Sequence, residues 1–142
     1  MRFIKKLFGI LPLRFAYAHC DVPCGIYDVK SAQIAAATVL KMVQLISALP
    51  KDNPTVDDRN KFVRCVLTKE EHGQKCKEEI LILWTDYFKE EHLEKFPDLH
   101  NLFWKTAKLC SKNKQEVSLT SAQTLVDSVN NIAEIFEESK QK

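Results

Sequence analysis

Apolar residues recur every three or four positions along four stretches of this chain, the spacing that places them on one face of an α-helix. No stretch shows the two-residue alternation of a half-buried strand. The pattern therefore predicts an all-α fold, an antiparallel up-down four-helix bundle, with helices over residues 29–49, 55–87, 99–110 and 120–136. The predicted core positions of the first two helices are Ile34, Val39, Met42, Val43, Ile46, Leu49, Phe62, Cys65, Val66, the Lys69 stem, Cys76, Ile80, Leu83 and Tyr87.

Polar residues mark where the predicted helices begin. Asp28 precedes the first helix as a cap, and Thr55 with Asp58 has the spacing of a capping box. The pair Thr120 and Gln123 has the same spacing before the last helix. Two prolines within residues 50–54 break the chain between the first two helices, and the charged residues 89–94 predict a connection before the third.

Composition and charge narrow the class of protein. The chain has 142 residues, 45% of them hydrophobic and 28% charged, with only three glycines and five prolines, which is typical of one globular helical domain. The formal net charge of +2 comes from 21 basic and 19 acidic residues, so nothing favours a nucleic acid partner. No apolar run has the length of a membrane span, so we expect no stable membrane association.

Residues 1–18 have the pattern of a segment that is removed. They begin with Arg2, Lys5 and Lys6, continue through an apolar run, and end in Ala16-Tyr17-Ala18. Pro12 and Arg14 interrupt the apolar part, which favours a dedicated propeptide over an export signal. Both interpretations place the cut before His19, and an uncleaved amphipathic first helix stays open on composition alone.

The five cysteines fall into two groups. An odd number excludes a complete set of intrachain disulfides. Cys65, Cys76 and Cys110 stand singly within helical patterns, and we predict that they are small buried hydrophobic residues. Cys20 and Cys24 lie beside His19 with three residues between them, which differs from the two-residue spacing of thioredoxin-like redox pairs and zinc knuckles.

The segment around Cys20 and Cys24 has the donors of a metal site. Pro23 fixes φ and Gly25 permits positive φ, so the segment can turn sharply and bring both sulfurs inward. Cleavage before His19 would add a free amine to its imidazole, and the Cys20 amide nitrogen lies between amine and thiol. Two nitrogens and two sulfurs in a plane below an imidazole favour Ni(II) or Cu(II) over tetrahedral zinc.

Residues 19–28, HCDVPCGIYD, resemble the nickel hook of the nickel superoxide dismutases, whose pattern is His-Cys-Asp-x-Pro-Cys-Gly-x-Tyr. The resemblance continues through residues 83–89, LWTDYFK, residues 92–100, HLEKFPDLH, and the closing residues 132–140. It covers essentially all of residues 19–142, which we predict to be one domain with its hook at residues 19–27.

The resemblance implies the activity and the cofactor. The chain would be an enzyme that converts superoxide to O2 and hydrogen peroxide by Ni(II)/Ni(III) cycling, with one nickel ion per subunit. The implied ligands are the amine and axial imidazole of His19, the amide nitrogen and thiolate of Cys20, and the thiolate of Cys24. A processing peptidase, a homohexamer and a cytoplasmic location are also implied, with export as the alternative if residues 1–18 are a signal peptide.

The resemblance also assigns residues around the metal. Tyr27 matches the tyrosine over the open nickel face, Asp21 contacts the hook backbone, and Asp86 and Tyr87 match positions nearby. Other family members have a glutamate and an arginine beside the axial imidazole, where this chain has Ala35 and His72. His72 is therefore a candidate support for His19. Packing alone is an alternative role for Tyr27 and Tyr87, and His72 is alternatively an exposed histidine on the helix surface. We assign structural roles to His92 and His100.

Two functions of other classes stay open on the sequence. The same terminal chelate would also suit a nickel or copper carrier that binds metal without turnover. A helical interaction module with an incidental leader is the other possibility, and it predicts no stoichiometric metal.

Overall fold

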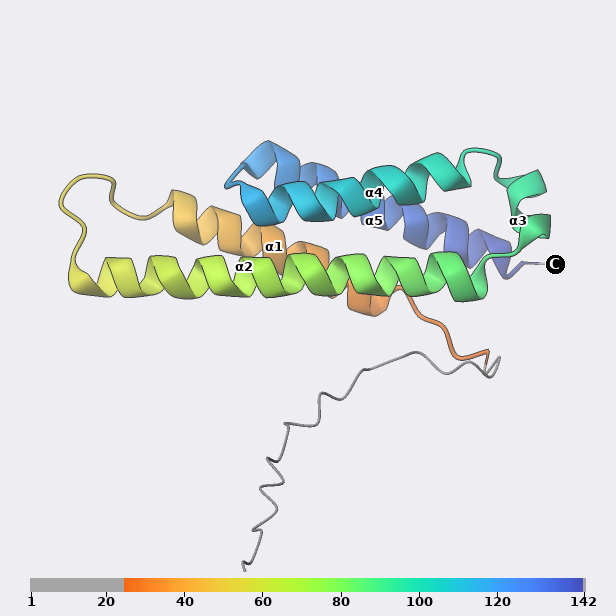
Figure 1. The fold of residues 1–142 in the computed structure, drawn as a ribbon, viewed down its shortest axis with the longest axis horizontal. Coiled ribbons are helices and arrows are strands. Elements are labelled where there is room, and N and C mark those ends of the chain that lie inside the picture. Colours follow the sequence, from red (N-terminus) through yellow and green to blue (C-terminus); the bar gives the residue numbers. More distant parts are fainter. Residues whose placement is uncertain (1–24, 142) are drawn as a thin grey trace, which may run out of the picture.

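The structure is a computed structural model, and it describes residues 25–141 of the chain (Figure 1). This part of the chain contains five α-helices, one π-helical turn and no strand, so the predicted all-α fold is confirmed. The predicted connection over residues 89–94 contains a short helix. The elements are α1 (Lys30–Ser47), α2 (Val56–Ile82), η1 (Leu83–Tyr87), α3 (Glu90–Lys95), α4 (Leu99–Gln115) and α5 (Leu119–Ser139).

The four long helices form a closed ring of neighbours. Helix α1 packs against α2 and α5, and α4 packs against α2 and α5. Successive long helices run in opposite directions, with the short α3 crossing one end of the bundle (Figure 1). Among residues 25–141, no helix has the combination of length and apolar character needed to cross a bilayer.

Side chains fix where the helices begin, mostly at the predicted positions. The Thr55 hydroxyl accepts the Asp58 amide at 3.1 Å while the Asp58 carboxylate accepts the Thr55 amide at 2.9 Å, which confirms that capping box. The Thr55 hydroxyl also donates to the Asp58 carboxylate at 2.6 Å, and this bond, followed by the one from the Thr55 amide, lowers the pKa of Asp58. Asp28 accepts the Lys30 amide at 2.9 Å, although the residue at the N-cap position is Val29.

The capping box predicted at Thr120 and Gln123 is wrong. Helix α5 begins two residues earlier, because Ser118 is extended (φ −138°, ψ 116°) and its hydroxyl accepts the Ser121 amide at 3.2 Å. Thr120 is already inside the helix. Two hydroxyl residues so close together offer two possible starts, and the sequence pattern did not distinguish them.

The core confirms most of the predicted stripes and corrects two positions. Val39, Val43 and Ile80 are fully buried, as are the α5 residues Leu125, Val129, Ile132 and Phe136. Ile34 is 56% exposed, because the alanines at 32, 35 and 36 form the buried face of that part of α1. Phe62 is 45% exposed. It lies near the start of α2, and the first turns of this helix extend beyond α4 and α5 (Figure 1).

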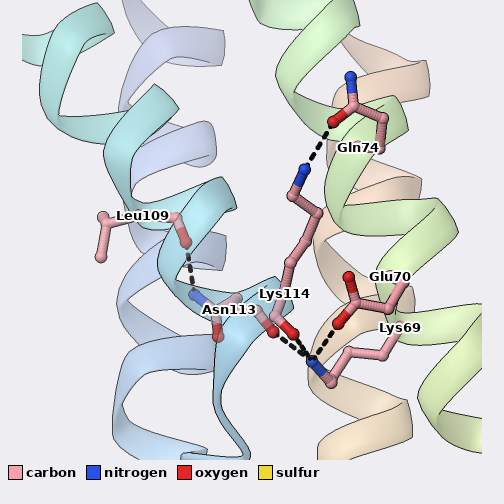
Figure 2. Close-up of polar contacts among 6 residues, drawn as sticks. All are labelled: Lys69, Glu70, Gln74, Leu109, Asn113 and Lys114. Carbon is pink, nitrogen blue, oxygen red and sulfur yellow. Dashed lines mark hydrogen bonds and ion pairs between the residues drawn. The ribbon is translucent and has the colours of Figure 1, made fainter.

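A buried lysine joins α2 to the end of α4. Lys69 is only 2% exposed, and its ammonium donates to the main-chain carbonyls of Asn113 at 2.5 Å and Lys114 at 2.7 Å (Figure 2). These carbonyls belong to the last turn of α4, which has no helical amides to satisfy them. The positive charge also lies at the negative end of the helix dipole, which favours it there.

Gly73, one turn further along α2, allows the two helices to approach. A Cβ atom at this position would lie 2.8 Å from Cγ of Lys114 and 3.5 Å from the carbonyl oxygen of Cys110. The stem of Lys114 therefore crosses α2 where there is no side chain, and its ammonium donates to Gln74 Oε1 at 2.7 Å. The lower helix propensity of this glycine is the cost of that close contact.

The three cysteines of this part of the chain are buried, as predicted. Cys65 is 6% exposed, and Cys76 and Cys110 have no exposed surface. Cys76 on α2 and Cys110 on α4 are hydrogen-bonded to each other, and this bond, together with burial, raises the pKa of Cys76. The Cys76 thiol therefore stays protonated near neutral pH and packs as a small hydrophobic group.

Candidate functional site

The predicted metal ligands lie outside the residues that the structure describes. His19, Cys20, Cys24 and their neighbour Asp21 all precede Gly25, the first described residue. Between residues 25 and 141, no group of three or more histidine, cysteine, aspartate or glutamate side chains could hold a metal ion. The described residues of the predicted site are Tyr27, His72, Asp86 and Tyr87, and we call the surface around Tyr27 and Tyr87 the wall.

Tyr27 is the point where this segment joins the bundle. Gly25 has φ of +68°, so the left-handed backbone allowed by glycine at the end of the hook motif is present. The Tyr27 side chain is half-buried, and its ring lies 5.5 Å from the ring of Tyr87 at an angle of 60°. The fold thus brings together two tyrosines that the sequence analysis had named separately.

A π-helical turn orients Tyr87. The last turn of the second long helix widens over η1, where the Phe88 amide donates to the carbonyl of Leu83 five residues earlier at 3.0 Å. The extra residue in this turn makes successive side chains point to different sides of the helix. Leu83 and Phe88 enter the core, whereas Tyr87 faces Tyr27 and the end of α5.

The ring of Tyr87 has contacts on several sides. His92 stacks on it at 5.6 Å with an angle of 16°, and Phe88 and Phe136 meet it edge to face at 5.0 and 4.7 Å. The hydroxyl of Tyr87 is hydrogen-bonded to the Ser139 hydroxyl at 2.8 Å. Ser139 was not among the predicted site residues, because no local signal links positions 52 residues apart.

Two histidines near this wall have structural roles, as predicted. His92 Nδ1 accepts the Lys89 amide at 2.9 Å at the start of α3, so this nitrogen carries no proton. His100 meets Trp84 edge to face at 4.5 Å. Both rings pack against aromatic residues of η1, and neither belongs to a cluster of metal ligands in the described part of the chain.

Asp86 lies on the exposed side of η1, next to Tyr87. The Thr85 hydroxyl lies 2.8 Å from Asp86 Oδ1 and 2.9 Å from the Leu81 carbonyl, so the carboxylate is held near the helix. A carboxylate at this position adds negative charge close to the tyrosine pair.

His72 is not part of the tyrosine cluster. It lies on α2, 15 residues before Tyr87, which is roughly 20 Å along the helix at 1.5 Å per residue. Its Nδ1 donates to the Thr68 carbonyl at 3.0 Å, which leaves Nε2 as an acceptor. Its place in the site therefore depends on the path of residues 19–24.

An apolar groove of about 550 Å³ lies on another side of η1, between the end of α2 and α4. Its lining is Leu81, Trp84, His100, Asn101, Phe103, Trp104 and Ala107. It has only one titratable side chain and no cluster of polar groups, so it lacks the chemistry of a metal centre.

Comparison with known proteins agrees with the resemblance seen in the motif. A family model described as nickel-containing superoxide dismutase matches residues 14–140. The chain is 36% identical over 137 residues to "Superoxide dismutase [Ni]" of Streptomyces coelicolor and 34% identical to the protein of that name from Streptomyces seoulensis. Each match covers 96% of this chain and 98% of the relative.

Solved structures are similar over the whole bundle. The native 1.30 Å structure of a nickel superoxide dismutase is 34% identical, with a TM-score of 0.78. The match covers 87% of this chain and all of the solved chain. An apo structure of a nickel superoxide dismutase is also similar, with a TM-score of 0.74 and 30% identity.

Proposed function

Because this chain belongs to the family of nickel-containing superoxide dismutases, we propose that its metal centre forms at the amino terminus exposed by cleavage before His19. The enzyme is an oxidoreductase that converts superoxide to O2 and hydrogen peroxide, and its cofactor is nickel. The match of the family model from residue 14 to residue 140 carries this assignment, because it includes the hook motif as well as the helices.

The donors of residues 19–24 fit nickel. The proposed ligands are the amine and imidazole of His19, the amide nitrogen and thiolate of Cys20, and the thiolate of Cys24. Thiolate and deprotonated amide are electron-rich and stabilise the oxidised metal, and this tetragonal set suits Ni(II). Nickel held there supplies the one-electron couple that oxidises one superoxide to O2 and reduces a second to peroxide.

The protein side chains control access and orientation at this centre. In our proposal Tyr27 would lie beside the bound metal, where its hydroxyl would order water and its ring would exclude anions larger than superoxide. Its contact with Tyr87 supports this placement, because Tyr87 is itself held on several sides. Asp21 binds the hook backbone and Asp86 lies beside the tyrosine pair, and both belong to the proposed site.

His72 remains a proposed support for the His19 imidazole. The eight peptide steps from His19 to Tyr27 can span at most about 28 Å when extended, and a compact hook spans less, so this contact requires the His19 end of the hook to point from Tyr27 along α2 toward His72. Nε2 of His72 can accept a hydrogen bond from the ring N–H of His19 that does not bind metal.

Removal of residues 1–18 is a separate step of the proposal. The curated relatives are matched over 96% of this chain, but the solved native chain is matched completely by 87% of it. The solved native chain therefore matches a smaller share of this chain than the curated relatives do. This difference supports a leader that is present in the encoded chain and absent from the mature one. We propose a processing peptidase, a mature domain of residues 19–142, a homohexamer and a cytoplasmic location.

The proposal is tested by comparing the chain that begins at His19 with the full-length chain. We expect about one nickel per trimmed chain and rapid superoxide dismutation, because only the trimmed chain has the free amine. The full-length chain should have neither. Metal analysis and stopped-flow loss of superoxide absorbance measure both properties, and equal nickel and equal rates in the two forms would contradict the terminal-amine site.

Replacing Tyr27 with phenylalanine tests whether its hydroxyl takes part in the reaction. The ring and its packing on Tyr87 stay, so we expect full nickel content. The dismutation rate should fall about 5-fold, the factor that corresponds to one hydrogen bond of about 1 kcal/mol. Metal analysis and the same kinetic assay give the result, and an unchanged rate would remove the Tyr27 hydroxyl from the reaction.

A further inference from the structure

The last turn of α5 is fastened to the wall that holds Tyr87. Lys95 of α3 donates to the Glu138 carbonyl at 3.2 Å and lies 3.8 Å from the carboxylate of the same residue. The Lys140 ammonium lies 3.9 Å from the centre of the Phe136 ring. The end of α5 is therefore held in place next to η1 and α3, at the same end of the bundle (Figure 1).

Ser139 in this turn gives the hydrogen bond of Tyr87 a direction. The Ser139 hydroxyl donates its proton to the Phe136 carbonyl at 2.7 Å. It can therefore only accept in its 2.8 Å contact with Tyr87, and the Tyr87 hydroxyl must donate. The proton of the Tyr87 hydroxyl thus points toward Ser139 of α5.

We propose that Ser139 is a positioning residue for the reaction, which acts through Tyr87 on Tyr27. The stacked His92 and the edges of Phe88 and Phe136 restrict the Tyr87 ring, and Ser139 fixes its hydroxyl. The ring of Tyr87 then forms a fixed surface for the ring of Tyr27 at 5.5 Å. This inference rests on the proposed role of Tyr27 over the metal.

The arrangement also determines which tyrosine can donate to an anion. Because the Tyr87 hydroxyl donates its hydrogen bond to Ser139, it can offer an anion only its oxygen lone pairs, and these repel superoxide. Loss of Ser139 would free that proton and create a second donor near Tyr27. Ser139 therefore favours a site with one tyrosine donor, and its loss should strengthen the binding of other small anions.

The first measurement uses the nickel-free trimmed chain and does not depend on activity. The sequence has three tyrosines, and trimming removes Tyr17, so Tyr27 and Tyr87 are the only two left. With ring-labelled tyrosine, nuclear Overhauser contacts between the two rings should be clear in the unmodified chain. They should weaken at least 2-fold in Ser139→Ala and return in Ser139→Thr, which keeps the hydroxyl.

The second measurement uses the nickel-loaded enzyme. Ser139→Ala should keep its nickel, lower the dismutation rate about 5-fold, and lower the azide concentration for half-inhibition by a similar factor. Ser139→Thr should restore most of both values. Tyr87→Phe combined with Ser139→Ala should be no slower than the slower single variant, because both changes break one bond.

Ser128→Ala is the matched control. It removes a serine hydroxyl from the same helix, one that is bonded to Thr106 and lies away from Tyr87. The inference is overturned if Ser139→Ala leaves the ring contacts and the azide response unchanged, if threonine does not restore them, or if Ser128→Ala changes them equally. Failure of the proposed function itself would appear in the unmodified trimmed chain, as absence of nickel-dependent dismutation, and the ring contacts would still decide the role of Ser139.

Discussion

Replacing Cys24 with serine is expected to reduce superoxide dismutation by at least about 1000-fold, the scale on which loss of an essential catalytic group acts. A serine oxygen is a hard donor and stays protonated near neutral pH, so it cannot stabilise oxidised nickel as a thiolate does. Cys20→Ser should have the same effect. The trimmed variants are compared with the trimmed unmodified chain by kinetic assay and metal analysis.

Cys65→Ser is the control for these two variants. Replacing Cys65 makes the same chemical change, but Cys65 is only 6% exposed and lies on α2 in the helical bundle. We expect its replacement to leave the rate and the nickel content unchanged. A Cys24→Ser variant that still turned over superoxide at the normal rate would show that Cys24 is not a ligand, and the proposed donor set would be wrong.

Lys69→Met is expected to lower the free energy of unfolding by about 3 kcal/mol. The methionine keeps the apolar stem, but the carbonyls of Asn113 and Lys114 lose the ammonium that satisfies them in a buried position. The 3.4 Å contact of Lys69 with Glu70 adds little, because that carboxylate is 44% exposed. Urea unfolding of the trimmed chain measures the change.

Lys75→Met provides the matched comparison on the same helix. Lys75 is exposed, and surface substitutions of this kind usually change stability by less than about 0.5 kcal/mol. Equal loss of stability in the two variants would mean that the carbonyls at the end of α4 do not depend on Lys69. Folded Lys69→Met should also have a dismutation rate similar to that of the unmodified chain, because Lys69 lies far from Tyr87 along α2. It is more than one helical turn beyond Gly73, on the side away from Tyr87.

Local patterns were sufficient to predict the four long helices and their order, but not the short helix α3. The three- and four-residue spacing of Val39, Val43 and Leu125, Val129 places each set on one helical face, and burial of both faces against each other gives a bundle. The capping box of Thr55 and Asp58 was predictable for the same reason, since its atoms lie within one turn. Short-range spacing did not identify the N-cap residue where two candidates lie close together, as Ser118 and Thr120 do before α5.

The metal chemistry was also contained in the sequence. The ligands proposed for nickel come from residues 19–24, so their identity and spacing can be read from one short segment, and the family match agrees with that reading. Tyr27 belongs to the same motif. His72 and Tyr87 are a different case, because His72 lies on α2 and Tyr87 lies roughly 20 Å further along, in η1.

The sequence by itself determined the fold class, the family and the proposed nickel ligands, because each depends on residues close together in the chain. Only the tertiary structure decided how the wall around Tyr27 and Tyr87 is built. It widened the last turn of the second helix into η1, placed Tyr87 against Tyr27, and brought Ser139 to the Tyr87 hydroxyl. These contacts join residues 52 and 60 positions apart, and only the packing of the four helices determines which such residues meet.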